Sequence, residues 1–365
     1  MTSAPTFRFS VKGQTGEIPQ LALGTATLFG DVCTGAVREA IRQGYRHIDT
    51  ALLYNNQAEV GKGIRDAISA GEVRREELFV TTKVAFYPAG ADESQIMVHI
   101  RRHAENEKGL EATRKAVDLC LQLLGLEYVD LILIHNPCTS VADYQASTSP
   151  HCFELGKGAA LGPSGLSAEE RELVIGRRIE AANASYDEAA AEAARASSWR
   201  ALEEARAAGK ARFIGVSNYA PRLVTAMDTY ATVQPAVNQL ELHPRFSSPT
   251  LRALAKERGF VLTGYGSGNS VRIEKSAVVA AIAQRRGETP IATVLRWTLQ
   301  RGVSVVPRTA TPAHIAENKR TADEAAAGAN ALSAEDLAAL DALNQGHCYY
   351  WSPLPLLPPG AKPDV

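Results

Sequence analysis

The feature that most constrains the fold is a regular alternation of short apolar runs with longer amphipathic segments. QLALGTATL is followed by CTGAVREAIRQG, then by YRHIDTA, NQAEVGKGIRDAISAG and ELFVTTKVAF, and the rhythm continues to VSVVPRT. Such an alternation is typical of parallel strands joined by helices. The candidate strands end near Thr25, Asp49, Lys83, His135, Ser217, Gln239, Tyr265 and Pro307. Eight such units are what a closed (β/α)8 TIM barrel requires, so we predict this α/β fold.

The chain length fits one barrel with additions. Barrels of this kind take about 250 residues, and the chain has 365, so we expect a single domain over 1–365. Ahead of the first barrel strand, FRFSVKGQTGEIPQL has the pattern of a β-hairpin, which we expect to cover the bottom of the barrel. Two insertions break the alternation, at about 88–111 and 138–197, and a C-terminal tail begins at about 346. Both insertions leave the carboxyl ends of strands, the ligand-binding side of this fold, and serve there either as lids or as surface decoration.

Composition and charge narrow the classes of partner. The chain is 45% hydrophobic and 22% charged, with a formal net charge of −1, so its composition gives no sign of binding to nucleic acid or an anionic membrane. It contains no apolar run long enough for a transmembrane helix and no apolar segment of a signal peptide near its start. Its five cysteines lack metal-ligand spacing. We therefore expect a cytoplasmic monomer that acts on a small molecule and binds no metal, nucleic acid or membrane.

Four polar residues stand where barrel strands end. Asp49, Lys83 and His135 close three predicted strands, and Tyr54 follows the strand that Asp49 closes, so all four converge on one pocket. A phenol is a weak acid at neutral pH and needs a nearby ammonium, which Lys83 supplies. Asp49 keeps the buried lysine charged, and His135 orients a carbonyl oxygen. Each residue alone is more often a packing or surface residue, but together they predict that Tyr54 protonates a carbonyl as general acid.

Several motifs, in the same order along the chain, resemble those of the aldo-keto reductase family. They are GYRHIDTALLYNNQAEVGKGI, LILIHNP, KARFIGVSN, AVNQLELHP and VVPRTATPAHIAENKR, and they cover residues 20–345 apart from the insertions. The resemblance implies an NAD(P)H-dependent barrel that has no Rossmann domain and reversibly reduces an aldehyde or ketone to an alcohol. It also implies that the catalytic tetrad is Tyr54, Lys83, Asp49 and His135.

The same resemblance implies which residues bind the cofactor. Those at the ends of barrel strands are Thr25, Asp49, Ser217, Asn218, Gln239 and Tyr265. Those expected at the adenosine end are Arg308, Thr309, His314, Glu317 and Asn318. Ser217, Asn218 and Gln239 correspond to hydrogen-bond partners of the nicotinamide carboxamide, and Tyr265 to the aromatic ring that stacks on it. Stacking leaves the other face of the ring free to deliver hydride. Some of the adenosine-end residues are equally suited to capping a helix that begins near Pro312.

One departure from the family pattern concerns the cofactor. Where the family usually has Lys-Ser and then Arg around a 2′-phosphate, this chain has Arg308, Thr309 and His314. Arg308 still offers a two-pronged phosphate contact, whereas a histidine lacks the permanent charge of an arginine. We therefore predict NADPH as the cofactor, with NADH possible.

Two further departures concern the pocket. The family often places tryptophans where this chain has Ala26, Ala85 and Asn136, so we expect a roomier, less aromatic substrate pocket. GYGSGNS, after the seventh barrel strand, is shorter than the usual run, and Gly266 and Gly268 are then the candidates for a backbone site for the pyrophosphate.

Other nucleotide-dependent classes fit poorly. The segment 61–66, GKGIRD, lacks the third glycine of a Rossmann fingerprint and lies in a helical pattern. Ala58 stands where a Tyr-x-x-x-Lys pair starting at Tyr54 would need its lysine, and no cysteine–histidine cluster supports a zinc dehydrogenase. One alternative from another class stays open: a cofactor-binding regulatory subunit of a larger complex, similar to the potassium-channel β subunits that share this barrel.

Overall fold

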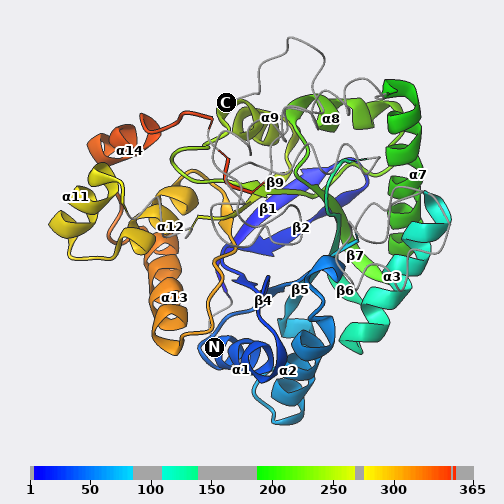
Figure 1. The fold of residues 1–365 in the computed structure, drawn as a ribbon, viewed down its shortest axis with the longest axis horizontal. Coiled ribbons are helices and arrows are strands. Elements are labelled where there is room, and N and C mark those ends of the chain that lie inside the picture. The colour runs from blue at the N-terminus through cyan, green and yellow to red at the C-terminus, as the bar shows by residue number, and fades with distance from the viewer. Residues whose placement is uncertain (1–3, 85–108, 139–186, 268–274, 347, 351–365) are drawn as a thin grey trace, which may run out of the picture.

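The chain folds into a parallel barrel with helices outside it (Figure 1). A computed structural model describes residues 4–84, 109–138, 187–267, 275–346 and 348–350. The barrel strands are β3 (Leu23–Gly24), β4 (His47–Asp49), β5 (Phe79–Val84), β6 (Val129–Ile134), β7 (Ala211–Ser217), β8 (Val237–Glu241), β9 (Val261–Tyr265) and β10 (Ser304–Val305). They pair in chain order, and bridges from Leu21 to Val305 and from Gly24 to Arg308 close the seam between first and last. The predicted TIM barrel is confirmed, and each predicted strand end lies at or within two residues of the observed one.

Helices surround the strands and bury their apolar faces on them (Figure 1). They are α1 (Gly30–Arg42), α2 (Gln57–Ser69), α3 (Leu110–Leu124), α7 (Glu188–Ala207), α8 (Pro221–Ala226), α9 (Pro249–Arg258), α11 (Ala277–Arg286), α12 (Pro290–Gln300), α13 (Pro312–Ala326) and α14 (Ala334–Asp341). Short 3-10 turns are η1 (Leu52–Tyr54), η2 (Arg75–Glu77) and η4 (Met227–Thr229). Gly259, which ends α9, has a φ of +83°, and a Cβ there would lie 2.4 Å from the carbonyl oxygen of Ser10. Only glycine fits at this close approach.

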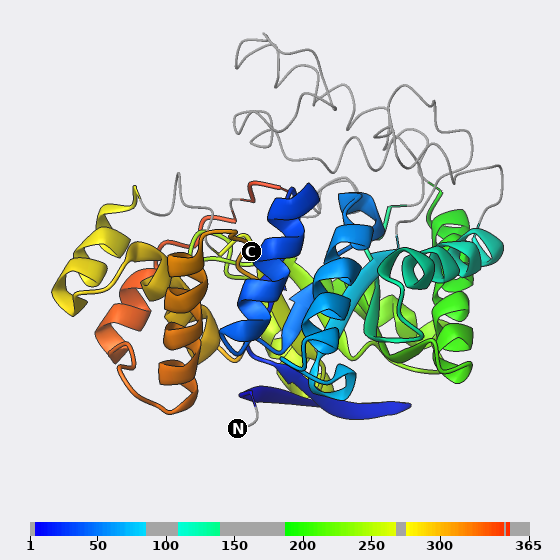
Figure 2. The same ribbon diagram turned by 90° about the horizontal axis from the view of Figure 1, so that it is seen from below.

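The predicted N-terminal hairpin is also confirmed. Strands β1 (Thr6–Val11) and β2 (Gln14–Pro19) are antiparallel and lie across the end of the barrel opposite the carboxyl ends of its strands (Figure 2). Phe9 and Ile18 are buried in a cluster with side chains of β5, β6, β8 and β9. Gln14 donates to the carbonyl oxygen of Ile214 at 2.8 Å, which ties the hairpin to β7. The hairpin thus closes the bottom of the barrel and leaves the other end for ligands.

Most of the two predicted insertions lies outside the described residues. At their borders, α3 starts at Leu110 and α7 at Glu188, with the Asp187 carboxylate accepting from the amide of Ala190 at 3.1 Å. The alanine- and glutamate-rich residues 188–197 therefore belong to α7, because they favour helix and continue it without a break. The C-terminal tail is described only at its first residues.

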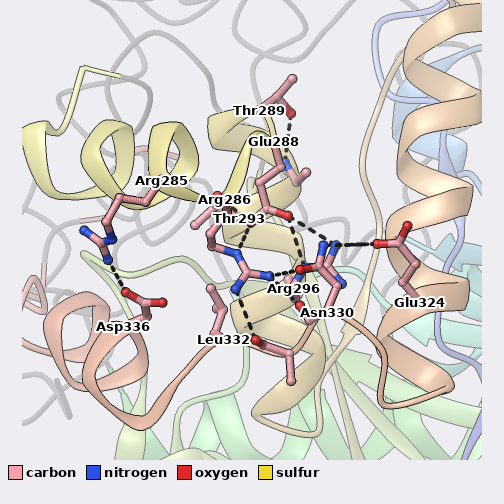
Figure 3. A network of polar contacts seen from close by, with 12 residues as sticks. Arg285, Arg286, Glu288, Thr289, Thr293, Arg296, Glu324, Asn330, Leu332 and Asp336 are labelled. Carbon is pink, nitrogen blue, oxygen red and sulfur yellow. Dashed lines mark hydrogen bonds and ion pairs between the residues drawn. The ribbon is translucent and has the colours of Figure 1, made fainter.

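A network of charged side chains joins the helices on one flank of the barrel (Figure 3). Arg296, on α12, is 1% exposed and donates to Glu288 at 3.2 Å and to Glu324, on α13, at 2.8 Å. Arg286, at the end of α11, donates to Glu288 at 2.8 Å. The buried guanidinium of Arg296 is thereby neutralised by two carboxylates. The shared contacts link α11, α12 and α13 to one another.

Candidate active site

Three of the four predicted catalytic side chains meet around one ammonium group. Lys83, on β5, is fully buried, and its Nζ donates to Oδ1 of Asp49 at 2.6 Å and to the carbonyl oxygen of Thr50 at 3.0 Å. It also donates to the hydroxyl of Tyr54 at 3.2 Å. Asp49 is the last residue of β4, and Tyr54 ends the short turn η1 that follows it. The adjacent parallel strands β4 and β5 therefore bring the carboxylate of Asp49, the ammonium of Lys83 and the phenol of Tyr54 together at the carboxyl end of the barrel.

The charges around Lys83 hold it protonated. Burial lowers the pKa of Lys83, but the Asp49 carboxylate and the Tyr54 hydroxyl raise it more, so its pKa lies above the ordinary value. Burial raises the pKa of Tyr54; Lys83 lowers it and Asp49 raises it, and the net direction is upward. Lys83 does lower the pKa of Tyr54, as expected from the sequence. Burial of the phenol raises this pKa by more than Lys83 lowers it. Tyr54 is therefore a protonated phenol that faces an ammonium.

His135 completes the set as a neutral imidazole. It follows β6, and its ring centroid lies 5.6 Å from that of Tyr54, with the two rings nearly perpendicular. Burial, together with the positive charge of Lys83, lowers the pKa of His135 to about 3. Within the described part of the chain its buried Nδ1 has no hydrogen-bond partner. A neutral imidazole both donates and accepts, so this side chain is suited to hydrogen-bond a carbonyl oxygen.

The predicted carboxamide-binding residues are joined to this cluster by hydrogen bonds. Gln239, on β8, donates from Nε2 to Oδ2 of Asp49 at 2.8 Å. The hydroxyl of Ser217, at the end of β7, donates to the carbonyl oxygen of Gln239 at 2.8 Å. Asn218 donates from Nδ2 to that hydroxyl at 3.2 Å. One connected network thus runs from the phenol of Tyr54 through Asp49 to the end of β7.

Asn218 holds an unusual position in this network. Its φ of +63° lies in the left-handed region, which asparagine tolerates better than most residues. Its Nδ2 donates to the carbonyl oxygen of His135 at 2.9 Å, and its Oδ1 accepts from the hydroxyl of Tyr265 at 2.7 Å. Asn218 therefore orients both the predicted stacking ring and the loop that bears His135.

These residues fit a nicotinamide. Gln239 commits its amide nitrogen to Asp49, which leaves its side-chain carbonyl oxygen as an acceptor for a primary amide. Ser217 and Asn218 add hydroxyl and amide groups beside it, and Tyr265 supplies an aromatic face. An amide-bearing aromatic ring needs this combination of polar edge and apolar face.

Sequence reasoning missed a buried carboxylate next to this site. Glu241, the last residue of β8, accepts from the backbone amides of Tyr349 at 2.6 Å and Tyr350 at 2.8 Å, and it lies 2.9 Å from Nε2 of His243. The ring of Tyr350 then lies edge-on to Tyr265, with 6.0 Å between centroids. The start of the C-terminal tail is thereby fixed beside the predicted stacking residue. The available signal was a charged residue at the end of VNQLE, a strand that is buried throughout.

The predicted adenosine-end residues are spread over the segment after β10 and the first turns of α13. Arg308 and His314 are exposed, whereas Thr309 and Glu317 are half-buried. The hydroxyl of Thr309 accepts from the amide of Thr311 at 3.1 Å, within the segment that leads into α13. Asn318 is 4% exposed, and the hydroxyl of Tyr45 donates to the carbonyl oxygen of nearby Ile315 at 3.1 Å, so this part of α13 also packs on the barrel. The helix begins at Pro312, as predicted.

The pocket-wall residues are only partly described. Ala26 is half-buried, and Asn136 turns its Oδ1 to the backbone amide of Cys138 at 3.2 Å. Gly266 has the positive φ, +76°, that a backbone anion site uses. Ala85 and Gly268 lie outside the described residues.

The described residues contain no group of three or more His, Cys, Asp or Glu side chains that could hold a metal ion. None of the helices described here has both the length and the apolar character needed to cross a membrane.

A closed parallel barrel with a tyrosine, a lysine, an aspartate and a histidine at the carboxyl ends of its strands defines a class of nicotinamide-dependent oxidoreductases. The chain belongs to the aldo/keto reductase family, whose sequence profile matches residues 20–345. As a member of this family it is an NAD(P)H-dependent oxidoreductase.

Curated relatives match the chain over most of its length. It is 32% identical to a 9,11-endoperoxide prostaglandin H2 reductase of Trypanosoma cruzi over 332 residues, which cover 90% of this chain and 88% of that protein. It is 32% identical to aldo-keto reductase family 1 member A1 of Bos taurus, with 91% and 88% covered. It is 30% identical to an NAD(P)H-dependent D-xylose reductase of Scheffersomyces stipitis, with 85% and 88% covered.

Solved structures agree with this assignment. An aldo/keto reductase from Brucella melitensis superposes with a TM-score of 0.66 at 26% identity and covers 94% of this chain and 99% of its own. A Bombyx mori aldo-keto reductase solved in complex with NADP gives a TM-score of 0.67 at 25% identity, with 96% and 95% covered.

Proposed function

We propose that this enzyme reduces an aldehyde or ketone to the alcohol, with Tyr54 as the general acid, and that the reaction is reversible. One observation carries the proposal: Nζ of Lys83 lies within hydrogen-bond distance of both the Asp49 carboxylate, at 2.6 Å, and the Tyr54 hydroxyl, at 3.2 Å. This arrangement stabilises the phenolate that is left when the phenol gives up its proton.

The residues divide the chemistry among them. Ser217, Asn218, Gln239 and Tyr265 would hold the nicotinamide cofactor, which would supply hydride to the carbonyl carbon. His135, as a neutral imidazole, donates a hydrogen bond to the carbonyl oxygen and fixes its direction. Tyr54 transfers its proton to that oxygen as negative charge develops there. Lys83 then faces the phenolate, and Asp49 prevents the ammonium from losing its own proton. In the reverse direction the phenolate accepts the proton of the alcohol.

For the cofactor we propose NADPH, with NADH as a weaker alternative. Ser217, Asn218, Gln239 and Tyr265 hold the nicotinamide, and Arg308 supplies a fork of N–H donors for the 2′-phosphate that distinguishes NADPH. Support comes from the Bombyx mori structure, which was solved with NADP. Comparing kcat/KM for the two cofactors tests this point, and a strong preference for NADH contradicts it.

The substrate class we propose is a small-molecule carbonyl compound. The named relatives include a D-xylose reductase and a prostaglandin H2 reductase, so the family accepts different substrates on the same barrel. Their names describe reductases and lend no support to a regulatory subunit. The expectation of a cytoplasmic monomer stays a prediction from the sequence; light scattering on purified enzyme tests its oligomeric part.

The deciding experiment is a spectrophotometric screen in which oxidation of NADPH is followed with aliphatic, aromatic and sugar aldehydes and with ketones. Tyr54→Phe is the matched control, because it removes one hydroxyl and keeps the ring. We expect kcat to fall by about 10²- to 10⁴-fold, with little change in the Kd of NADPH, because the phenol acts on the reacting oxygen. Equal activity of the variant and the wild type contradicts the mechanism.

A further inference from the structure

The turn after β3 places a β-branched residue in a conformation that such residues rarely adopt. Thr27 is exposed and has a φ of +63°, in a turn closed by a hydrogen bond from the amide of Leu28 to the carbonyl oxygen of Thr25 at 3.0 Å. Glycine or asparagine would meet this requirement with less strain. A strained threonine persists only where the surrounding structure holds it, and such residues cluster at functional sites.

A buried asparagine holds this turn. Asn56 is fully buried, and its Nδ2 donates to the carbonyl oxygens of Thr25 at 2.7 Å and Leu28 at 2.9 Å. The hydroxyl of Thr50 donates to its Oδ1 at 3.0 Å. The turn is thus clamped at both ends to the segment after β4 that contains Tyr54. Its conformation does not depend on Thr27, so the threonine side chain is presented by a rigid support.

The hydroxyl of Thr27 meets the arginine on the other side of the barrel seam. Nη1 of Arg308 donates to Oγ1 of Thr27 at 2.6 Å. At the same seam Gly24 bridges to Arg308, and its amide donates to the carbonyl oxygen of Pro307 at 2.9 Å. Within the described residues, this is the only side-chain hydrogen bond of Arg308. A guanidinium has five N–H donors, so the others remain for a ligand.

We propose that Thr27 is a specificity-determining residue, which anchors the guanidinium of Arg308 so that its free edge meets the phosphate on the adenosine ribose. The inference rests on the proposed binding of NADPH by Arg308, and it adds Thr27, across the seam, to the residues that determine cofactor preference. An arginine held by one edge loses less side-chain freedom when it binds a phosphate. The effect applies to the 2′-phosphate, which NADPH carries and NADH lacks.

The test compares three changes at one position. Thr27→Val keeps the shape and the branched Cβ but removes the acceptor, Thr27→Ser keeps the hydroxyl, and Thr27→Gly relieves the strain and removes the hydroxyl. The Kd values of NADPH, NADH and 2′,5′-ADP are measured by titration calorimetry on the full chain. We expect Thr27→Val and Thr27→Gly to weaken NADPH and 2′,5′-ADP by about five- to tenfold and NADH by less than about twofold. Thr27→Ser stays near the wild type.

A double-mutant cycle with Arg308→Met distinguishes this role from a purely structural one. If Thr27 acts through the arginine, Thr27→Val has no further effect on NADPH in the Arg308→Met background. Equal weakening of NADPH and NADH, or an unchanged effect of Thr27→Val without the arginine, overturns the proposal. Failure of the wild type to bind NADPH contradicts the proposed function itself. Normal binding and turnover with an unaltered 2′,5′-ADP affinity in Thr27→Val refutes the role of Thr27 alone.

Discussion

The barrel contains two buried ion-pair clusters that use similar groups for different purposes. On the catalytic face, Lys83 is paired with Asp49 and also donates to Tyr54, a group with a proton to give. On the helical flank, Arg296 is enclosed by Glu288 and Glu324 and has no such third partner among the described residues (Figure 3). A buried cation matched by carboxylates is a structural element by itself. We propose that it takes on a catalytic role when a group with a proton to give, as Tyr54 has, shares the cation.

The largest effect is expected from removing the charge of Lys83 while keeping the length of its side chain. Lys83→Met should lower kcat by about 10²- to 10⁴-fold, because the phenolate loses its counter-charge. It should also reduce the free energy of unfolding by about 3–5 kcal/mol, because Asp49 stays buried and unpaired. Adding Asp49→Asn should restore most of the stability and none of the activity, as measured by urea denaturation and steady-state kinetics. Recovery of kcat in the double variant would show that the ion pair serves stability only.

The matching change on the flank should affect stability alone. Arg296→Met leaves Glu288 and Glu324 without their shared cation, so we expect the free energy of unfolding to fall by about 3–5 kcal/mol. The kcat per folded molecule should stay within about twofold of the wild type, because no reacting group contacts Arg296. Urea denaturation and active-site titration measure the two quantities. A tenfold loss of kcat would mean that the two clusters are coupled.

Two histidines, one at each end of the barrel, should make the stability of the fold depend on pH. The pKa of His135 is lowered to about 3, by burial and then by Lys83, and that of His47 is lowered to about 3 by the same causes. An unfolded histidine titrates near 6.5. Between these values the unfolded chain binds protons that the folded chain does not, so stability is complete above about pH 6.5 and falls as the pH drops toward 3.

Replacing either histidine should therefore flatten this decline by up to about 1.4 kcal/mol per pH unit. His135→Asn should also lower kcat, whereas His47→Asn, at the start of β4 and away from the reacting groups, should leave it unchanged. Urea denaturation at pH 4 to 7 measures the slope. An unaltered slope in both variants would refute the assignment of neutral buried imidazoles.

The smallest expected effect concerns Glu241, whose carboxylate accepts mainly from backbone amides. Glu241→Gln replaces one acceptor by a donor, so the amides of Tyr349 and Tyr350 should exchange hydrogen about fivefold faster. Glu288→Gln, in the flank cluster, is the control and should leave both amides as protected as in the wild type. Hydrogen exchange read by mass spectrometry or NMR compares the variants. Equal protection in Glu241→Gln would mean that ring packing, and not the carboxylate, holds the tail.

Much of the site could be predicted because its residues sit where local patterns end. Asp49, Ser217 and Tyr265 are the last residues of their strands, at positions that hydrophobic periodicity alone locates. The role of Glu241 could not be predicted in the same way, since the two backbone amides that it accepts from belong to residues more than a hundred positions away. Thr27 lies outside the motifs that the sequence offers. A threonine also does not signal a left-handed backbone, because such residues rarely adopt one.

The sequence by itself determined the order of the strands and helices, the barrel they form and the identity of the four polar residues at its carboxyl end. Periodicity and turn residues are local properties, and closure of parallel strands then places their ends together. Only the tertiary structure decided the protonation of these residues. Burial, which depends on the whole fold, outweighs Lys83 at Tyr54 and makes His135 neutral. It also decided which distant segments meet, Arg308 with Thr27 and Glu241 with the tail, because hydrogen bonds across a barrel seam depend on three-dimensional proximity.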